Sequence, residues 1–112
     1  MTRYDKVTRK KLRELSGESY ERELGEQLNE LLDRFHDWKN GAIESSELSD
    51  FIHKFHNGVS REIYKLYNFL PEEDIVARAL VLDYLTEDEV PENIIEQISP
   101  RIEIYKQKLD SE

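Results

Sequence analysis

The sequence contains no cysteine and, among its 112 residues, only four glycines and three prolines. Without cysteine the chain forms no disulfide bond, no thiolate metal site and no cysteine nucleophile, which suits a protein of the reducing cytoplasm. So little glycine and proline also argues against a turn-rich all-β chain. We therefore expect a cytoplasmic protein built mainly of helices.

Long apolar stretches are absent as well. No run of apolar residues approaches the roughly 20 that a membrane-spanning helix requires. The basic N-terminal residues are not followed by the apolar segment that signal peptides contain. We therefore expect neither membrane contact nor secretion.

Charged residues make up 37% of the chain and give it a net charge of −9. Their distribution is uneven: residues 1–13 hold six basic residues and one acidic residue, a net +5, so the other 99 residues carry −14. An acidic body of this kind argues against general affinity for nucleic acid or acidic membranes. A protein is the partner that remains.

The most apolar stretch, IVARALVLDYL from Ile75 to Leu85, predicts the centre of the fold. It follows Pro71 and three acids, an order typical of a helix start, because acids complement the positive end of the helix dipole. A helix that is apolar nearly all round is buried on several sides. We predict an all-α fold: one domain over 1–112, a compact bundle of five or six helices around a buried central helix at about 72–85.

The N-terminal segment predicts a short basic helix. Ser16-Gly17 is expected to end it, since glycine readily takes the left-handed conformation that closes helices. Residues 1–16 would then form a separate arm. One side of this helix is apolar in the sequence: Tyr4, Val7, Leu12 and Leu15.

Apolar residues at spacings of three and four predict two further helices, over about 18–39 and 45–70. Ser45 or Ser46 is expected to cap the second, and Asn57-Gly58 to kink or break it. Ser99-Pro100 predicts the cap and first turn of a last helix.

The turn from Phe35 to Leu48 resembles the later half of an EF-hand calcium loop. Gly41 matches the sixth position, where that family turns sharply, and Glu47 the twelfth, whose carboxylate binds the ion in that family. The first and third positions hold His36 and Trp38 in place of oxygen ligands. A helix–turn–helix joint built on an Asn-Gly turn explains the same residues, and we predict no calcium site.

The three histidines, His36, His53 and His56, are candidate metal ligands. His36 and His53 each follow an aspartate by three positions, a spacing similar to the Glu-x-x-His pairs of di-metal helical bundles. On a helical wheel both side chains fall about 120–140° from the apolar stripe. Ligands of a bundle metal must project inward, so we predict no metal and no other cofactor.

Two acidic pairs, Glu23 with Glu26 and Glu47 with Asp50, support an alternative, enzymatic interpretation. Their spacing is similar to the acidic signature of the all-α nucleotide pyrophosphohydrolases. That resemblance implies four carboxylates holding Mg²⁺ against a triphosphate. On the wheels, however, all four lie opposite the apolar stripes. We predict a protein that is not an enzyme and keep this hydrolase as the alternative.

A basic face on the N-terminal segment supports a second alternative, binding of nucleic acid along its phosphate backbone. The acidic body would repel nucleic acid, so docking of this face on that body, or on a second copy, is preferred. The residues that share the face are Arg3, Lys6, Arg9, Lys10 and Arg13.

Several aromatic residues exceed what the narrow apolar stripes need, among them Trp38, Tyr64 and Tyr67. Exposed aromatic side chains ringed by charge are typical of protein contacts. We therefore predict a small acidic helical module that binds another protein, as regulatory or neutralising proteins do, or a second copy of itself. These aromatic residues and the basic face are its predicted binding residues.

Overall fold

The computed structural model describes residues 4–110, which form helices and turns without a strand, so the all-α class is confirmed. The elements are α1 (Lys6–Lys39), α2 (Ser45–Lys54), the π-helical turn η1 (Phe55–Val59), α3 (Ser60–Phe69), α4 (Glu72–Leu82), the 3₁₀ turn η2 (Glu87–Glu89) and α5 (Glu92–Asp110). In this part of the chain no helix combines the length and the apolar character needed to cross a membrane.

The chain divides into two compact units. Unit 1 takes in the chain up to Tyr20 and from Phe69 onward, and unit 2 is Glu21–Asn68. Helix α1 contributes its first half to unit 1 and its second half to unit 2. Packing of every helix around residues 72–85 stays a prediction, because those residues belong to unit 1 alone.

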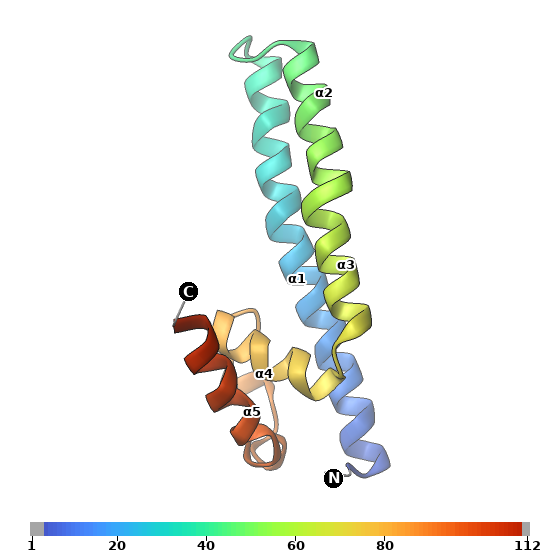
Figure 1. Cartoon of the computed structure of the whole chain (residues 1–112), viewed down its shortest axis with the longest axis vertical. Coiled ribbons are helices and arrows are strands. Elements are labelled where there is room, and N and C mark those ends of the chain that lie inside the picture. Colours follow the sequence, from blue (N-terminus) through green and yellow to red (C-terminus); the bar gives the residue numbers. More distant parts are fainter. Residues whose placement is uncertain (1–3, 111–112) are drawn as a thin grey trace. The chain divides into compact units, whose positions relative to one another are not determined.

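Helix α4 supplies the centre of the unit 1 core. Its side chains Ile75, Val76, Ala77 and Ala79 are at most 1% exposed, and it lies side by side with α5 (Figure 1). The helix ends at Leu82, earlier than predicted, because Asp83 takes the left-handed conformation with φ 67°. Leu85 lies beyond this end and is still buried, at 1% exposed. The apolar run therefore marks the core correctly and the helix end too late.

Helix α1 runs through Ser16-Gly17 without ending, so the predicted stop is wrong. Glycine costs a helix interior about 1 kcal/mol relative to alanine, and burial of this face outweighs that cost. The predicted apolar side of this helix is also partly wrong, because Val7, which was assigned to it, is 79% exposed. Two polar residues that an apolar pattern cannot reveal share the buried face: Thr8 and Ser19, with Leu12 and Leu15.

Helix α5 begins at Glu92 and contains Pro100 in its interior, so the prediction that Pro100 opens a helix is wrong. Proline has no amide hydrogen to donate to the carbonyl four residues earlier. The hydroxyl of Ser99 donates to that carbonyl, of Glu96, at 3.0 Å. Ile94 and Ile98, on the first half of the helix, are at most 2% exposed. This burial and the Ser99 hydrogen bond together hold the helix across the proline.

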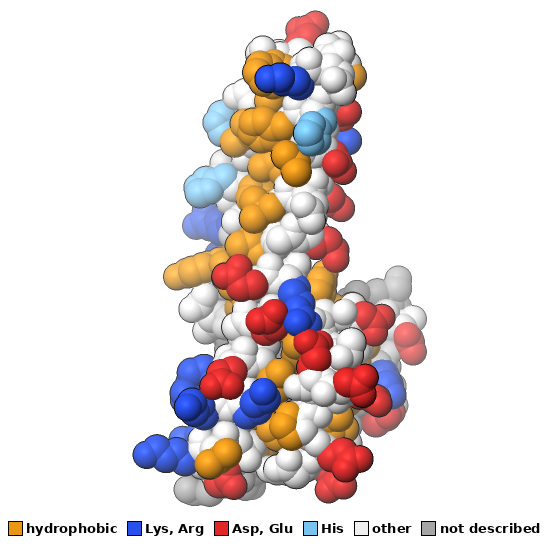
Figure 2. Space-filling view, turned by 180° about the vertical axis from the view of Figure 1, so that it is seen from behind, with side chains coloured by type: hydrophobic (Ala, Val, Ile, Leu, Met, Phe, Trp, Pro, Cys, Tyr) orange, Lys and Arg blue, Asp and Glu red, His pale blue; other side chains and the backbone are white. Residues whose placement is uncertain are grey.

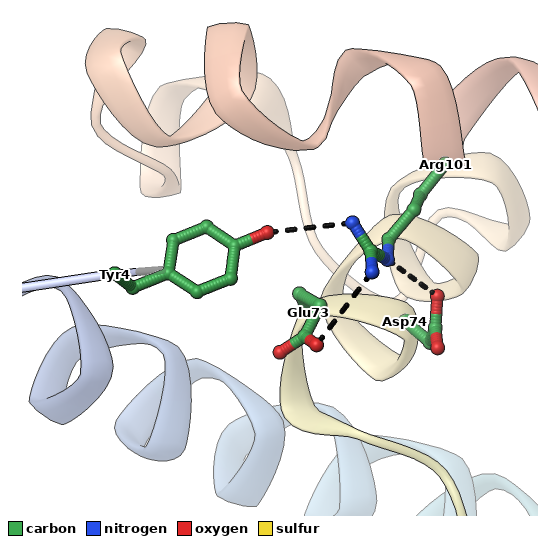
Figure 3. A network of polar contacts seen from close by, with 4 residues as sticks. All are labelled: Tyr4, Glu73, Asp74 and Arg101. Carbon is green, nitrogen blue, oxygen red and sulfur yellow. Dashed lines mark hydrogen bonds and ion pairs between the residues drawn. The ribbon is translucent and has the colours of Figure 1, made fainter. Parts of the chain in front are cut away.

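A network around Arg101 joins three segments of unit 1 (Figure 3). Its Nε donates to Asp74 Oδ1 at 3.0 Å, and its guanidinium lies 3.8 Å from Glu73 Oε1 and 3.5 Å from the Tyr4 hydroxyl. Burial raises the pKa of Tyr4, which Arg101 opposes and the two acids reinforce. The network ties α5 to the start of α4 and to the segment that precedes α1.

Unit 2 is a helical hairpin. The second half of α1 lies beside α2, η1 and α3, which follow one another as a continuous rod (Figure 1). The turn uses Gly41 at φ 79°. At Asn57-Gly58, where a kink or break was predicted, the α-helix is interrupted by the π turn, which keeps the rod helical, and α3 begins at Ser60.

The cap of α2 also differs from the prediction. The N-cap residue is Glu44 rather than Ser45 or Ser46, and its amide donates to Glu47 Oε1 at 3.1 Å in a capping box. Glu47, at the position that matches the last EF-hand ligand, therefore serves as a helix cap. The turn is the helix–turn–helix joint that the sequence favoured.

Candidate interaction surface

Two hydrogen bonds fix how the helices of unit 2 are aligned. Near the turn, Trp38 Nε1 donates to Ser45 Oγ at 3.0 Å. At the other end, the hydroxyl of Tyr67 donates to Glu23 Oε1 at 2.7 Å. The alignment is antiparallel, with residue 38 opposite 45 and residue 23 opposite 67.

This alignment separates the two acidic pairs of the hydrolase interpretation. Glu23 and Glu26 lie at the Tyr67 end, whereas Glu47 and Asp50 lie near the turn. The stretch of α1 from residue 23 to residue 38 spans about 22 Å at roughly 1.5 Å per residue. Glu23 is 8% exposed and bound to Tyr67, and Glu47 caps α2. The four carboxylates do not share one cleft.

The histidines give no metal site either. His36, His53 and His56 are exposed. Across residues 4–110, histidine, aspartate and glutamate side chains nowhere gather in a group of three or more that could hold an ion.

About half of the large apolar side chains of unit 2 are exposed. Within Glu21–Asn68 those that are buried are Leu48 and Ile63. A two-helix hairpin has a single seam, so residues on either side of that seam stay uncovered. The large apolar side chains exposed by 37% to 59% in this unit are Leu28, Leu32, Phe35, Trp38, Phe51, Ile52, Val59 and Tyr64.

Their positions relative to the seam follow from a contact between the helices. The guanidinium of Arg34 lies 5.6 Å from the centre of the Phe51 ring, which places both on one side of the seam. The next residues, Phe35 and Ile52, are each turned by about 100°. Because the helices are antiparallel, this rotation carries both to the opposite side. Tyr64, which follows the buried Ile63, is turned to that side in the same way.

Leu28 and Leu32 continue the row of Phe35 along α1, at the i, i+4 and i+7 spacing that shares a helix face. We call Leu28, Leu32, Phe35, Ile52 and Tyr64 the hairpin strip. Figure 2 shows apolar side chains running along the hairpin, with histidine side chains on both sides of them. Tyr64 was among the binding residues predicted from the sequence. The other four strip residues were missed, because they lie on the apolar stripes that were expected to point into a core.

The other side of the seam carries a shallow hollow of about 210 Å³. The π turn contributes Phe55 and Val59 to its wall. Arg34 Nε is buried there without an acceptor among the described residues, although another nitrogen of its guanidinium pairs with Asp37 at 3.0 Å. The remaining lining residues are Gln27, Glu30, Leu31, Phe51 and Lys54.

The predicted binding residues divide into three groups. Tyr64 belongs to the strip, and Trp38 is 41% exposed with its Nε1 bonded to Ser45. Tyr67 is half-buried, with its hydroxyl on Glu23. The basic residues lie on the exposed side of α1: Lys6, Arg9, Lys10 and Arg13, with Arg3 outside the described residues.

The basic face makes little contact with the acidic body. Arg13 Nε lies 3.9 Å from Glu72 Oε1, and both side chains are exposed. Exposed pairs of this kind contribute little stability. Lys6, Arg9 and Lys10 form no ion pair within residues 4–110.

Comparison of the chain with protein-family models, with curated proteins and with solved structures finds no match. Function is therefore argued from the geometry of the hairpin.

Proposed function

We propose that this protein is a helical protein-interaction module and that the hairpin strip is its binding surface. The observation that carries the proposal is the exposure of five large apolar side chains, by 37% to 59%, along one side of a folded hairpin. Contiguous exposed apolar surface is typical of interaction sites. Removing apolar surface from water is the main favourable term in most protein association.

The two alternatives lack an observation of comparable weight. The carboxylates of the hydrolase interpretation lie at opposite ends of the hairpin, with Glu23 and Glu47 already engaged. The basic face of α1 has no aromatic side chain beside its cations on which a base could stack, apart from Tyr4, which contacts Arg101. Protein binding is therefore the function that the geometry favours.

A photoreactive amino acid placed at position 32 in living cells tests the proposal. Leu32 is 50% exposed within the strip, so the probe should form a discrete covalent adduct with a bound protein. The matched control is the neighbouring position, Asp33, which is exposed but turned about 100° away. An adduct from position 32 and none from 33 supports the proposal. No adduct from 32, or equal adducts from both, would overturn it.

A further inference from the structure

The hairpin strip has features that select one kind of occupant. Resting on the proposed function, we infer that this occupant is a second copy of the chain. Two hairpins then meet strip to strip, related by a two-fold axis, and form a four-helix bundle. A two-helix hairpin cannot enclose a core, whereas two such hairpins facing each other do.

The border of the strip is uncharged beside α1, α2 and η1 and basic beside α3. On α1 the residues just beyond Leu32 around the helix are Asn29 and His36. On α2 and η1 they are Ser49, His53 and His56, and all five are exposed. On α3 the residues in the same position beyond Tyr64 are Arg61 and Lys65, which are also exposed. Figure 2 shows white, pale blue and basic side chains next to the apolar ones, with acidic side chains along one outer edge of the hairpin. A basic partner would find cations and neutral side chains rather than carboxylates along this border.

On α1 the charges in line with the strip stand at its two ends and have opposite signs. Glu21 and Lys39 are eighteen residues apart on α1, which is five full turns, so both lie in line with Leu28 and Leu32. About 27 Å of helix separates them, and they cannot pair with each other. Each is exposed and forms no ion pair within the described residues.

A two-fold axis across the middle of the strip gives both charges a partner on the second copy. It runs the two α1 helices antiparallel, so that Glu21 of one copy faces Lys39 of the other, and the reverse pair forms at the far end. A self-complementary interface requires this arrangement, in which residue i meets j and j meets i. A partner of different sequence would not make the same chain supply both charges.

The strip supplies part of the area that a dimer needs. An aromatic side chain presents about 150–250 Å² when fully exposed, and applying this value to all five strip residues, each 37% to 59% exposed, gives at most roughly 350–580 Å². Trp38 and the polar border raise this toward the roughly 800 Å² that each partner contributes to a standard interface. The strip therefore supplies about half of the area that each partner of a standard interface contributes, and the side chains around it must supply the rest.

Sedimentation equilibrium of the full chain tests the pairing. The chain should sediment as a dimer, and Leu32→Glu should raise the dimer dissociation constant by at least about 100-fold, since it places a charge in the interface twice. Leu32 is half exposed, so the monomer should keep its helical circular dichroism. Asp33→Asn, outside the strip, is the control and should stay dimeric. A monomeric wild-type chain, or a dimer that Leu32→Glu leaves intact, would overturn the inference.

Charge reversal tests the antiparallel arrangement. Glu21→Lys and Lys39→Glu should each weaken the dimer about 5-fold at low salt, because each creates two like-charge contacts. The double variant should regain the wild-type affinity, since its pairs are restored with exchanged signs. If the double variant is weaker than either single variant, the two ends do not face each other and the proposed dimer is wrong.

The two proposals fail in different ways. If the probe at position 32 is captured by another protein while the purified chain is monomeric, the second-copy inference is overturned and the proposed function stands. If position 32 yields no adduct and the chain is monomeric, both are overturned. An adduct of two copies, together with dimeric sedimentation, supports both.

Discussion

The hydroxyl of Tyr67 and the carboxylate of Glu23 lie 2.7 Å apart, although the two residues are separated by 44 positions in the sequence. Glu23 is only 8% exposed, and a carboxylate that is withdrawn from water needs hydrogen-bond donors. The bond therefore serves a buried acid and at the same time aligns α1 with α3. The same alignment sets which apolar side chains form the hairpin strip.

Replacing Tyr67 with phenylalanine should destabilise unit 2 by about 1–2 kcal/mol, because it removes a hydrogen bond to a charged group. Urea denaturation followed by circular dichroism measures the change. Tyr64→Phe is the matched control. That tyrosine is 59% exposed, so removing its hydroxyl should leave the urea midpoint unchanged. Equal midpoints for the two variants would show that the bond contributes no stability.

Arg101 should contribute more to the stability of unit 1 than other cations of α5. Replacing it with leucine leaves Asp74 and Glu73, each 21% exposed at the side chain, without this partner. We expect a loss of about 1–3 kcal/mol in thermal or urea denaturation, with Arg101→Lys recovering part of it.

The control for Arg101 lies on the same helix. Lys106 pairs with Glu103 at 3.6 Å, with both side chains more than half exposed. Exposed pairs contribute between zero and about 1 kcal/mol. A Lys106→Ala variant as unstable as Arg101→Leu would contradict the role given to the network.

The start of α1 should depend on pH through Asp5. The backbone amide of Thr8 donates to Asp5 Oδ1 at 2.7 Å, and this bond, followed by one to the Thr8 hydroxyl, lowers the pKa of Asp5 from 3.8. Because the native pKa is lowered, the contribution to stability is present above pH 3.8. It is lost as the pH falls through the lower native value.

Hydrogen exchange of the first amides of α1 measures this contribution. Protection should fall in the wild-type chain as the pH is taken below 3.8, after correction for intrinsic exchange rates. Asp5→Asn keeps an oxygen that caps the helix but removes the titration, so its corrected protection should stay level. Glu14→Gln, on an exposed part of the same helix, should behave as the wild type. A titration that persists in Asp5→Asn would assign it to another group.

Composition and periodicity predicted the helical class and the burial of most of residues 75–79, because a helix that is apolar nearly all round is buried on several sides. They did not predict where helices end, since Gly17 and Pro100 lie inside helices that tertiary packing holds together. Nor did they predict the strip. Periodicity shows which side of a helix is apolar, whereas what covers that side depends on the number of layers in the fold. For Leu28 and Leu32 the hairpin supplies no second layer.

The continuity of α1 leads to a prediction about its glycine. A Cβ added at Gly17 would meet nothing within 4 Å, and its backbone is helical. Gly17→Ala should therefore stabilise unit 1 by about 0.5–1 kcal/mol, by restricting the unfolded chain and favouring the helix. Urea denaturation measures the gain.

Gly41→Ala is the opposing control, because its φ of 79° is a conformation that costs alanine about 1 kcal/mol or more. It should destabilise the hairpin turn, although a Cβ there would also meet nothing within 4 Å. The two substitutions are chemically identical, so opposite signs would isolate backbone conformation as their cause. If Gly17→Ala were destabilising as well, residue 17 would have to be non-helical in solution. Helix α1 would then end where the sequence suggested.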